Sequence, residues 1–213
     1  NKIIKEKNLE INNLNKIIEE KNLEIDNKEI KKVVSKLKYT TGDEISNNTA
    51  SSLDRNIFDN LPKWKNLKTT IENEFKRFKD EVMLWKTNDF IITTSWSTRS
   101  KPKQESHKHR HKNCVYSGVY YLDVPVNSGN IKFYDPNETD ISIIPSVYTE
   151  TNSSSLTLKI KEGDVIFFPS EIPHSITVNK SKQTRYSIAF NFFPTGTLGK
   201  GDSTLSFSKY VSI

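Results

Sequence analysis

The stretch from residue 163 to residue 191, GDVIFFPSEIPHSITVNKSKQTRYSIAFN, contains three apolar β runs in close succession. Gly163 lies in the turn that precedes the first run, and Asn179-Lys180-Ser181 separates the second run from the third. Glycine and asparagine favour such turns because they tolerate positive φ angles. Short runs joined without intervening helices predict antiparallel strands in a sandwich or barrel.

The same pattern extends back to Asn88. Upstream of it, apolar residues from Trp64 to Trp85 follow helical spacing, which predicts a helix packed on the sheet. We therefore expect a mainly β fold, an antiparallel jelly roll with a packed N-terminal helix. The expected strands lie near residues 90–96, 115–122, 130–134, 156–160, 165–168, 175–178 and 184–193.

The N-terminal sequence is a repeat, because Lys2–Asn15 and Lys16–Glu29 are identical at 10 of 14 positions. Isoleucine recurs every seven residues, but lysine occupies most positions three residues further on, so the heptad seam is weak. We interpret residues 1–40 as a helical or coiled-coil arm, 41–60 as a linker and 61–213 as the β domain. A solvated helix without a partner is the alternative for the arm. Asn1 in place of Met is consistent with a segment of a longer protein.

The formal net charge of +6 is concentrated between Arg99 and Lys112, where six basic side chains face only Glu105. Lysine dominates the basic residues and the aromatic residues alternate as in barrel strands, so we do not expect nucleic-acid binding. No apolar run approaches the roughly 18 residues that cross a bilayer. A lone cysteine, Cys114, forms no internal disulfide. We therefore expect a cytoplasmic protein without a membrane segment.

His107, His109 and His111 alternate just before an expected strand, and His174 follows Pro173. Alternation by two places side chains on one face of an extended segment. In isolation, such a tract is also typical of an exposed basic loop.

Arg185 and Ser187 also share a face, on the last long strand. A guanidinium directed into a small barrel needs an anion, and its planar fork suits a carboxylate, with the Ser187 hydroxyl as a further donor. This pair predicts an anion site.

As an ordered set, these motifs resemble the iron(II)- and 2-oxoglutarate-dependent oxygenases, many of them from phages and marine bacteria, whose fold is a double-stranded β-helix. The resemblance spans roughly residues 88 to 195. It rests on the H-x-H motif at residues 109–111, SGVYYL at 117–122, SGNIKFYDP at 128–136, the Gly163 to His174 segment and RYSIAFN at 185–191.

The resemblance implies that His109, His111 and His174 bind iron(II) and that Arg185, with Ser187, anchors the far carboxylate of 2-oxoglutarate. It further implies that molecular oxygen and 2-oxoglutarate are consumed, with release of succinate and carbon dioxide, while an unidentified substrate is hydroxylated. Tyrosines 116, 120 and 121 either contact 2-oxoglutarate or pack in the strand.

One position departs from the family, whose usual ligands are two histidines and one carboxylate. His111 stands where Asp or Glu is expected. Three interpretations are open. Three imidazoles bind the iron, only two side chains bind it, or Asp135 supplies the missing carboxylate. We favour the three histidines.

Two other functions remain open. One is a cupin-type dioxygenase, in which three histidines hold a metal without 2-oxoglutarate. The other is a non-catalytic β module on a helical stalk. Oligomerisation or fusion to another domain would run through the arm.

Overall fold

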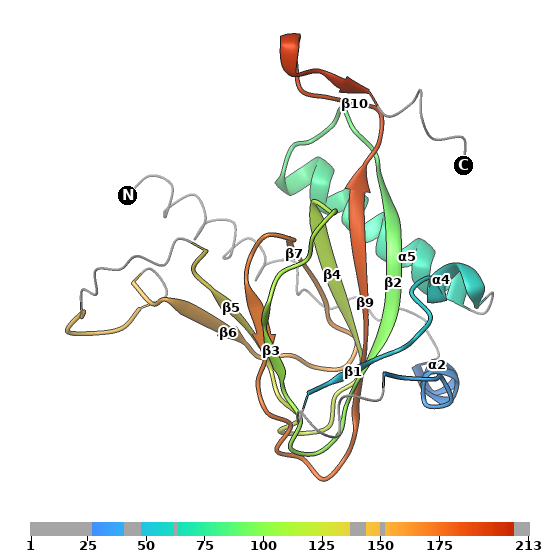
Figure 1. Ribbon diagram of the computed structural model, residues 1–213, viewed down its shortest axis with the longest axis vertical. Helices are drawn as coiled ribbons and strands as arrows, with labels where there is room; N and C mark the ends of the chain where they lie inside the picture. Colours follow the sequence, from blue (N-terminus) through green and yellow to red (C-terminus); the bar gives the residue numbers. More distant parts are fainter. Residues whose placement is uncertain (1–26, 41–47, 62–63, 137–143, 150–151, 207–213) are drawn as a thin grey trace.

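The computed structural model describes residues 27–40, 48–61, 64–136, 144–149 and 152–206 (Figure 1). Most of the N-terminal repeat, and with it the expected coiled coil, lies outside these residues. No helix in the described part of the chain is long and apolar enough to span a bilayer.

Two antiparallel sheets form the body of the protein, as the sequence predicted. The five-stranded sheet has the order β1-β2-β9-β4-β7 and the four-stranded sheet the order β3-β8-β5-β6. The larger sheet contains β1 (Ala50–Ser51), β2 (Phe90–Ser100), β9 (Arg185–Pro194), β4 (Tyr116–Asp123) and β7 (Val165–Pro169). The smaller sheet contains β3 (Ser106–His109), β8 (His174–Ile176), β5 (Ile131–Tyr134) and β6 (Ser155–Leu158).

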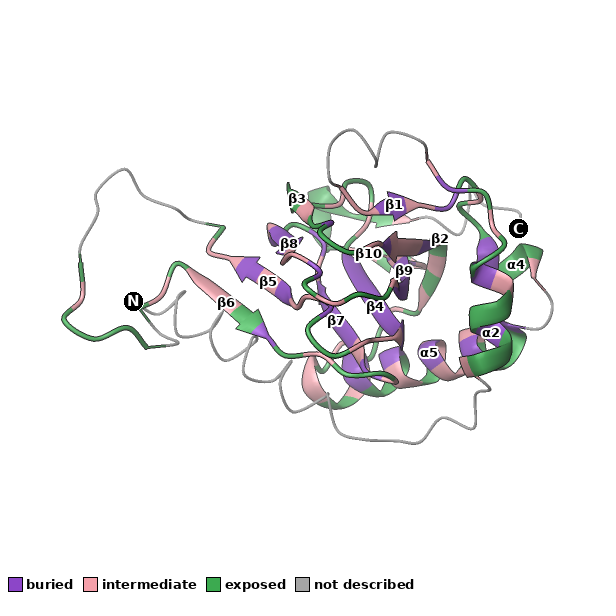
Figure 2. Cartoon of the chain, turned by 90° about the horizontal axis from the view of Figure 1, so that it is seen from below, coloured by how far each residue is buried: buried purple, intermediate pink, exposed green. Residues whose placement is uncertain are grey.

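A helix covers the outer face of the larger sheet, again as expected. Helix α5 (Lys65–Arg77) continues into the π-helical turn η2 (Phe78–Val82). Phe75 stacks on Phe192 of β9 with ring centroids 3.9 Å apart, and Phe78 packs on Tyr116 of β4. Figure 2 shows the resulting buried layer between helix and sheet. The β4 strand is buried on both faces because its other face lines the interior between the sheets.

Part of the segment before α5 also packs on the β domain. Helix α2 (Asn27–Val34) buries Ile30 and Val34, while β1 pairs with β2 and is followed by the short helix α4 (Ile57–Asn60). These residues fall within the stretch that the sequence assigned to the arm and the linker. Their buried apolar side chains join the common core.

Several short elements were not expected from the sequence. Strand β3 contains no apolar residue and, among the strands that the structure describes, pairs only with β8. Near the C-terminus, β10 (Thr197–Leu198) and β11 (Leu205–Ser206) form a small hairpin around the 3₁₀ turn η3 (Gly201–Ser203). The β5–β6 pair extends away from the body (Figure 2).

Candidate active site

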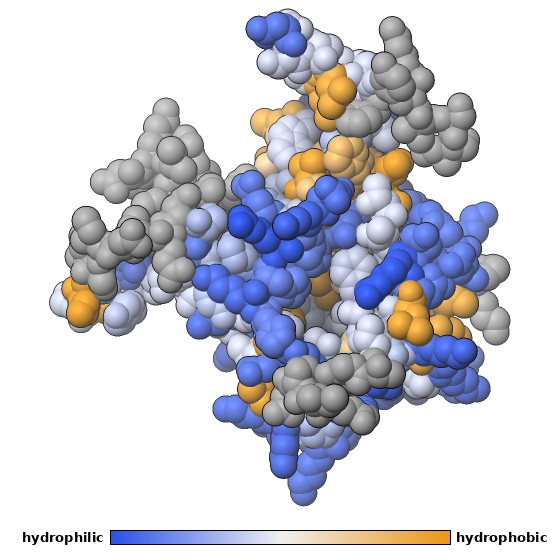
Figure 3. All heavy atoms as spheres, in the orientation of Figure 1, coloured by the Kyte–Doolittle hydropathy of each residue, from blue (hydrophilic) through white to orange (hydrophobic). Residues whose placement is uncertain are grey.

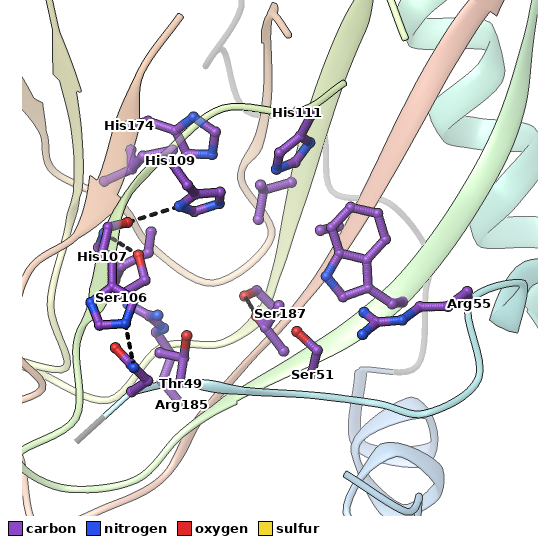
Figure 4. A pocket seen from close by; sticks show the side chains of 17 residues that line it. Thr49, Ser51, Arg55, Ser106, His107, His109, His111, His174, Arg185 and Ser187 are labelled. Carbon is purple, nitrogen blue, oxygen red and sulfur yellow. Dashed lines mark hydrogen bonds between the residues drawn. The ribbon is translucent and has the colours of Figure 1, made fainter. Parts of the chain in front are cut away.

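A cavity of about 470 Å³ opens between the two sheets and is bounded on one side by the segment 48–55 (Figure 4). Strands β3 and β8 contribute histidines, and β9 contributes Arg185 and Ser187. Val119, Ile131 and Ala189 form an apolar part of the lining. A cavity of this size is typical of small-molecule sites.

Three histidines converge in this cavity. His109 and His174 are directly opposed in the β3–β8 pairing, and His111 follows two residues after the end of β3. One ring nitrogen of each lies within 4.8 Å of the others. The ring centroid of His174 is 4.4 Å from that of His109 and 5.1 Å from that of His111. The structure thus brings the three predicted ligands together.

Hydrogen bonds at Nδ1 orient all three rings. The Nδ1 of His174 donates to Ile172 O at 3.0 Å, and that of His109 donates to His107 O at 2.8 Å. The Nδ1 of His111 lies 2.7 Å from Asn191 Oδ1, which accepts its proton. Each Nε2 therefore keeps its lone pair, the arrangement that metal-binding histidines use.

Burial keeps two of the rings neutral. Desolvation, reinforced by the neighbouring His109, lowers the pKa of His174 to about 3, and burial also lowers the pKa of His111. Neutral imidazole is the form that binds a metal.

His107 differs from the other three histidines. It lines the mouth of the cavity, is exposed, and its Nε2 contacts Asn48 Nδ2. It does not belong to the group of converging nitrogens, so the alternating tract supplies two members of that group and not three.

Arg185 is only 1% exposed. Its Nη1 donates to Ser128 O at 3.2 Å and to Gly129 O at 3.4 Å, and its Nε has no hydrogen-bond partner. Among the described residues no carboxylate forms an ion pair with it. An uncompensated buried guanidinium is costly in free energy. Arg185 therefore fits a bound anion.

Side chains next to Arg185 extend this anion site. Ser187 is buried and its hydroxyl lies 2.5 Å from that of Thr98. Tyr121 is paired with Ser187 across β4 and β9, so it points to the same face of the sheet. Its buried hydroxyl has no partner in the described part of the chain, and burial raises its pKa even though Arg185 opposes this.

The other two tyrosines of β4 point to the opposite face. Tyr120 donates to Asn27 of α2 at 2.5 Å, and Tyr116 packs against α5. Their role is packing, which leaves Tyr121 as the tyrosine of this strand that faces the cavity side.

Asp135 lies apart from the histidines. It follows the end of β5, its backbone N–H donates to Ser154 O at 2.9 Å, and it does not line the cavity. Within the described residues, no carboxylate joins the three-histidine group. The donor set present is three imidazole nitrogens, a set suited to a divalent transition metal such as iron(II).

The sequence of residues 94–191 matches the family model described as "Putative 2OG-Fe(II) oxygenase". The matched segment spans 98 of the 213 residues, and over this segment the chain resembles that family. The family uses iron(II) and 2-oxoglutarate, so the predicted cofactors and oxygenase activity are confirmed at the level of the family. The matched segment contains the three histidines, Arg185 and Ser187. No curated protein matches the sequence.

Solved structures share the fold at low sequence identity. An oxidoreductase of the 2OG-Fe(II) oxygenase family from Burkholderia pseudomallei is 14% identical, with a TM-score of 0.55 over 79% of this chain and 77% of that chain. HygX from Streptomyces hygroscopicus, solved with nickel and 2-oxoglutarate bound, is 11% identical, with a TM-score of 0.54 over 79% of this chain and 78% of that chain. The double-stranded β-helix fold is thereby confirmed.

Sequence reasoning missed one wall of the cavity. Thr49, Ser51 and Arg55 line it from the N-terminal side, together with Trp96 and Thr98 of β2. Long-range contacts bring this wall to the site: β1 pairs with β2 across more than forty residues of sequence, and the backbone N–H of Ser95 donates to Arg55 O. No local motif in the sequence indicates that contact.

Proposed function

We propose that the protein hydroxylates a substrate C–H bond, with iron(II) held by His109, His111 and His174. In this proposal Arg185 binds the far carboxylate of 2-oxoglutarate, assisted by the hydroxyls of Ser187 and Tyr121. One observation carries it. A buried guanidinium without an anionic partner shares a cavity with three imidazoles whose Nε2 lone pairs are free.

Bound iron(II) and 2-oxoglutarate supply the oxidising chemistry, in which molecular oxygen is reduced, 2-oxoglutarate yields succinate and carbon dioxide, and the substrate gains a hydroxyl group. The protein contributes position and environment. His107 O, Ile172 O and Asn191 hold the three rings in place. The apolar lining limits access of water to the reacting groups.

A three-imidazole site is the reading that the donor set supports best. The position of Asp135 outside the cavity lining argues against its use as a ligand. A two-ligand site would leave one converging nitrogen without a role, since all three rings are hydrogen-bonded in the same way at Nδ1.

The test is the visible absorption band that 2-oxoglutarate produces when it chelates iron(II) under nitrogen. Iron-loaded protein should give the band. Arg185→Gln should shift its appearance to at least tenfold higher 2-oxoglutarate concentration, and His174→Ala should abolish it with loss of stoichiometric iron. His107→Ala, a matched exposed histidine outside the converging group, should retain both.

The same measurement separates the alternatives. A cupin-type dioxygenase would bind iron through the histidines but give no band and no dependence on Arg185. A non-catalytic module would bind no divalent metal at all. The lack of an anionic partner for Arg185 favours the oxygenase over both alternatives, because neither of them gives that buried charge a role.

We further propose that the N-terminal repeat forms a helical arm that links this domain to a second copy or to another domain, and that the protein works in the cytoplasm. The heptad spacing of isoleucine supports the arm, and the single free Cys114 is consistent with a reducing compartment. Light scattering tests the arm. If Ile11→Lys and Ile18→Lys together leave the mass in solution unchanged, self-association through the repeat is excluded.

A further inference from the structure

The wall of the cavity opposite the histidines carries a cation that neither the metal nor the cosubstrate uses. Arg55 lines the cavity from the segment 48–55. Figure 4 shows its side chain extending toward the side of the cavity that holds Ser51 and Ser187, with the histidine cluster beyond them. Neither proposed cofactor occupies this wall, so a substrate can bind there.

An aromatic ring links Arg55 to the proposed metal site. The Arg55 guanidinium carbon lies 5.9 Å from the centroid of the Trp96 ring. The Trp96 ring is in turn 5.5 Å from that of His111. One indole therefore separates the guanidinium from a proposed iron ligand, so a small molecule held by Arg55 reaches the histidines.

Arg55 has hydrogen-bonding capacity to spare. Its side chain forms no ion pair and no hydrogen bond among the described residues. The adjacent carboxylate of Asp54 is already used, since it accepts from the backbone N–H of Asn56 at 2.8 Å and from the side chain of Asn60 at 3.0 Å. The planar donors of the guanidinium thus remain available.

The charge of the cavity favours an anion at this place. The described lining contains two arginines and no Asp or Glu. In the proposed holoenzyme three neutral imidazoles add no charge and the two charges of 2-oxoglutarate equal those of iron(II), so the two arginines leave the site with a net positive charge, and Arg55 has no anionic partner. A site with a carboxylate ligand would have one positive charge fewer.

We infer that the substrate carries a carboxylate or phosphate group that Arg55 binds while the C–H bond to be hydroxylated lies beside the histidines. This inference rests on the proposed function, whose substrate class it names. A guanidinium binds either group through two parallel hydrogen bonds, and the cation–π contact with Trp96 places it beside the ring. The hydroxyls of Thr49 and Ser51 on the same wall provide further donors.

Surface charge agrees with an anionic ligand. Lys101 and Lys103 precede the histidines in the sequence and Lys112 follows them, and the face that carries β1 and β3 is mostly hydrophilic (Figure 3). Positive charge at the approach raises the encounter rate with anions in a salt-dependent manner.

Trp96 offers a direct probe of binding. Zinc-loaded protein saturated with 2-oxoglutarate is titrated with benzoate, with phenylphosphonate and with uncharged benzamide, and tryptophan fluorescence is recorded. We expect a saturable change with benzoate or phenylphosphonate and none with benzamide. The anion that binds more tightly indicates whether the substrate carries a carboxylate or a phosphate group.

Two matched variants locate the binding. Arg55→Gln should weaken anion binding at least tenfold, whereas Arg110→Gln, an equal loss of charge at an exposed residue outside the lining, should leave it unchanged. Circular dichroism checks that both variants fold. Equal binding by Arg55→Gln and wild type, or binding of benzamide as tight as that of benzoate, overturns the inference.

Two measurements together separate this inference from the proposed function. One is the anion titration repeated without zinc and 2-oxoglutarate, and the other is the absorption band of the iron chelate. Anion binding that depends on Arg55 in a protein that gives no iron chelate band supports the anion site and rejects the oxygenase assignment of the histidines. A chelate band in a protein whose anion binding ignores Arg55 supports the oxygenase and rejects the anion site.

Discussion

His109 and His174 face each other across the β3–β8 pairing, with their ring centroids 4.4 Å apart. The register of two short strands thus sets the separation of two proposed iron ligands, while hydrogen bonds at Nδ1 set the direction of each ring. The position and orientation of these side chains are fixed before any metal binds.

The hydrogen bond from His111 to Asn191 should tune metal affinity. Asn191→Leu removes the nearer acceptor of the Nδ1 proton and leaves the Ser117 hydroxyl at 2.9 Å, so we expect iron affinity to fall by about 10-fold. Asn191→Asp keeps an oxygen acceptor and should retain most of the affinity. Competition with a colorimetric chelator measures both. Equal affinity in Asn191→Leu and wild type would show that the bond has no such role.

The metal-free protein should lose stability as the pH falls. The pKa of His174 is about 3 in the folded state, below the usual value of about 6.5 that applies after unfolding. Between these two pH values the unfolded chain binds a proton that the folded chain does not. The contribution of neutral His174 to the free energy of unfolding is therefore fully present above about pH 6.5 and declines below it.

From pH 7 to pH 5 this effect amounts to about 2 kcal/mol at most. Chemical denaturation at both values, with a chelator present, measures it. His174→Asn should show a smaller decline, whereas His107→Ala should decline like the wild type. A wild-type protein that is equally stable at both values would contradict the prediction.

Arg185 should strengthen the binding of 2-oxoglutarate but lower the stability of the ligand-free protein. Arg185→Met removes a buried charge that lacks an anionic partner, so we expect the metal-free variant to be more stable by on the order of 1 kcal/mol. The same variant should lose measurable 2-oxoglutarate binding. Thermal unfolding with and without 2-oxoglutarate tests both parts. A destabilised variant would indicate that the bond to Ser128 O outweighs the cost of burial.

A side chain at position 118 should lower the stability of the protein. A Cβ atom there would lie 2.2 Å from Phe190 Cε2, so Gly118→Ala should cost about 1–3 kcal/mol of unfolding free energy. Because the clash is with a ring, Phe190→Leu should cost less in the Gly118→Ala background than alone. A double-mutant cycle measures this coupling, and strictly additive costs would refute the clash.

Removal of a stacked aromatic ring from the core should cost more. Phe75→Ala removes a ring that is 2% exposed and lies 3.9 Å from Phe192, so we expect a loss of about 3–5 kcal/mol. Val126→Ala, at a position that is 83% exposed, should change stability by less than about 0.5 kcal/mol. Denaturant titration of both variants compares them.

Local patterns in the sequence predicted β4, β5, β7 and β9 because apolar runs and turn residues mark strands directly. Strand β3 was not predicted, since its sequence SHKH has no apolar residue and its pairing with β8 is a long-range contact. The histidines and Arg185 were found because their chemistry is unusual at those spacings. Arg55 and Trp96 were not, because only the folded sheet brings them together.

The position of Arg55 on the β1 side of the larger sheet has a consequence for divergence. All residues proposed to hold iron and 2-oxoglutarate fall within residues 94–191, whereas Arg55 precedes that stretch. In this proposal the residue that binds the substrate anion lies outside the segment that holds the cofactors, although its neighbour Trp96 lies inside it. Exchanging the part before residue 94 between relatives would redirect the enzyme to new molecules while its chemistry stayed the same.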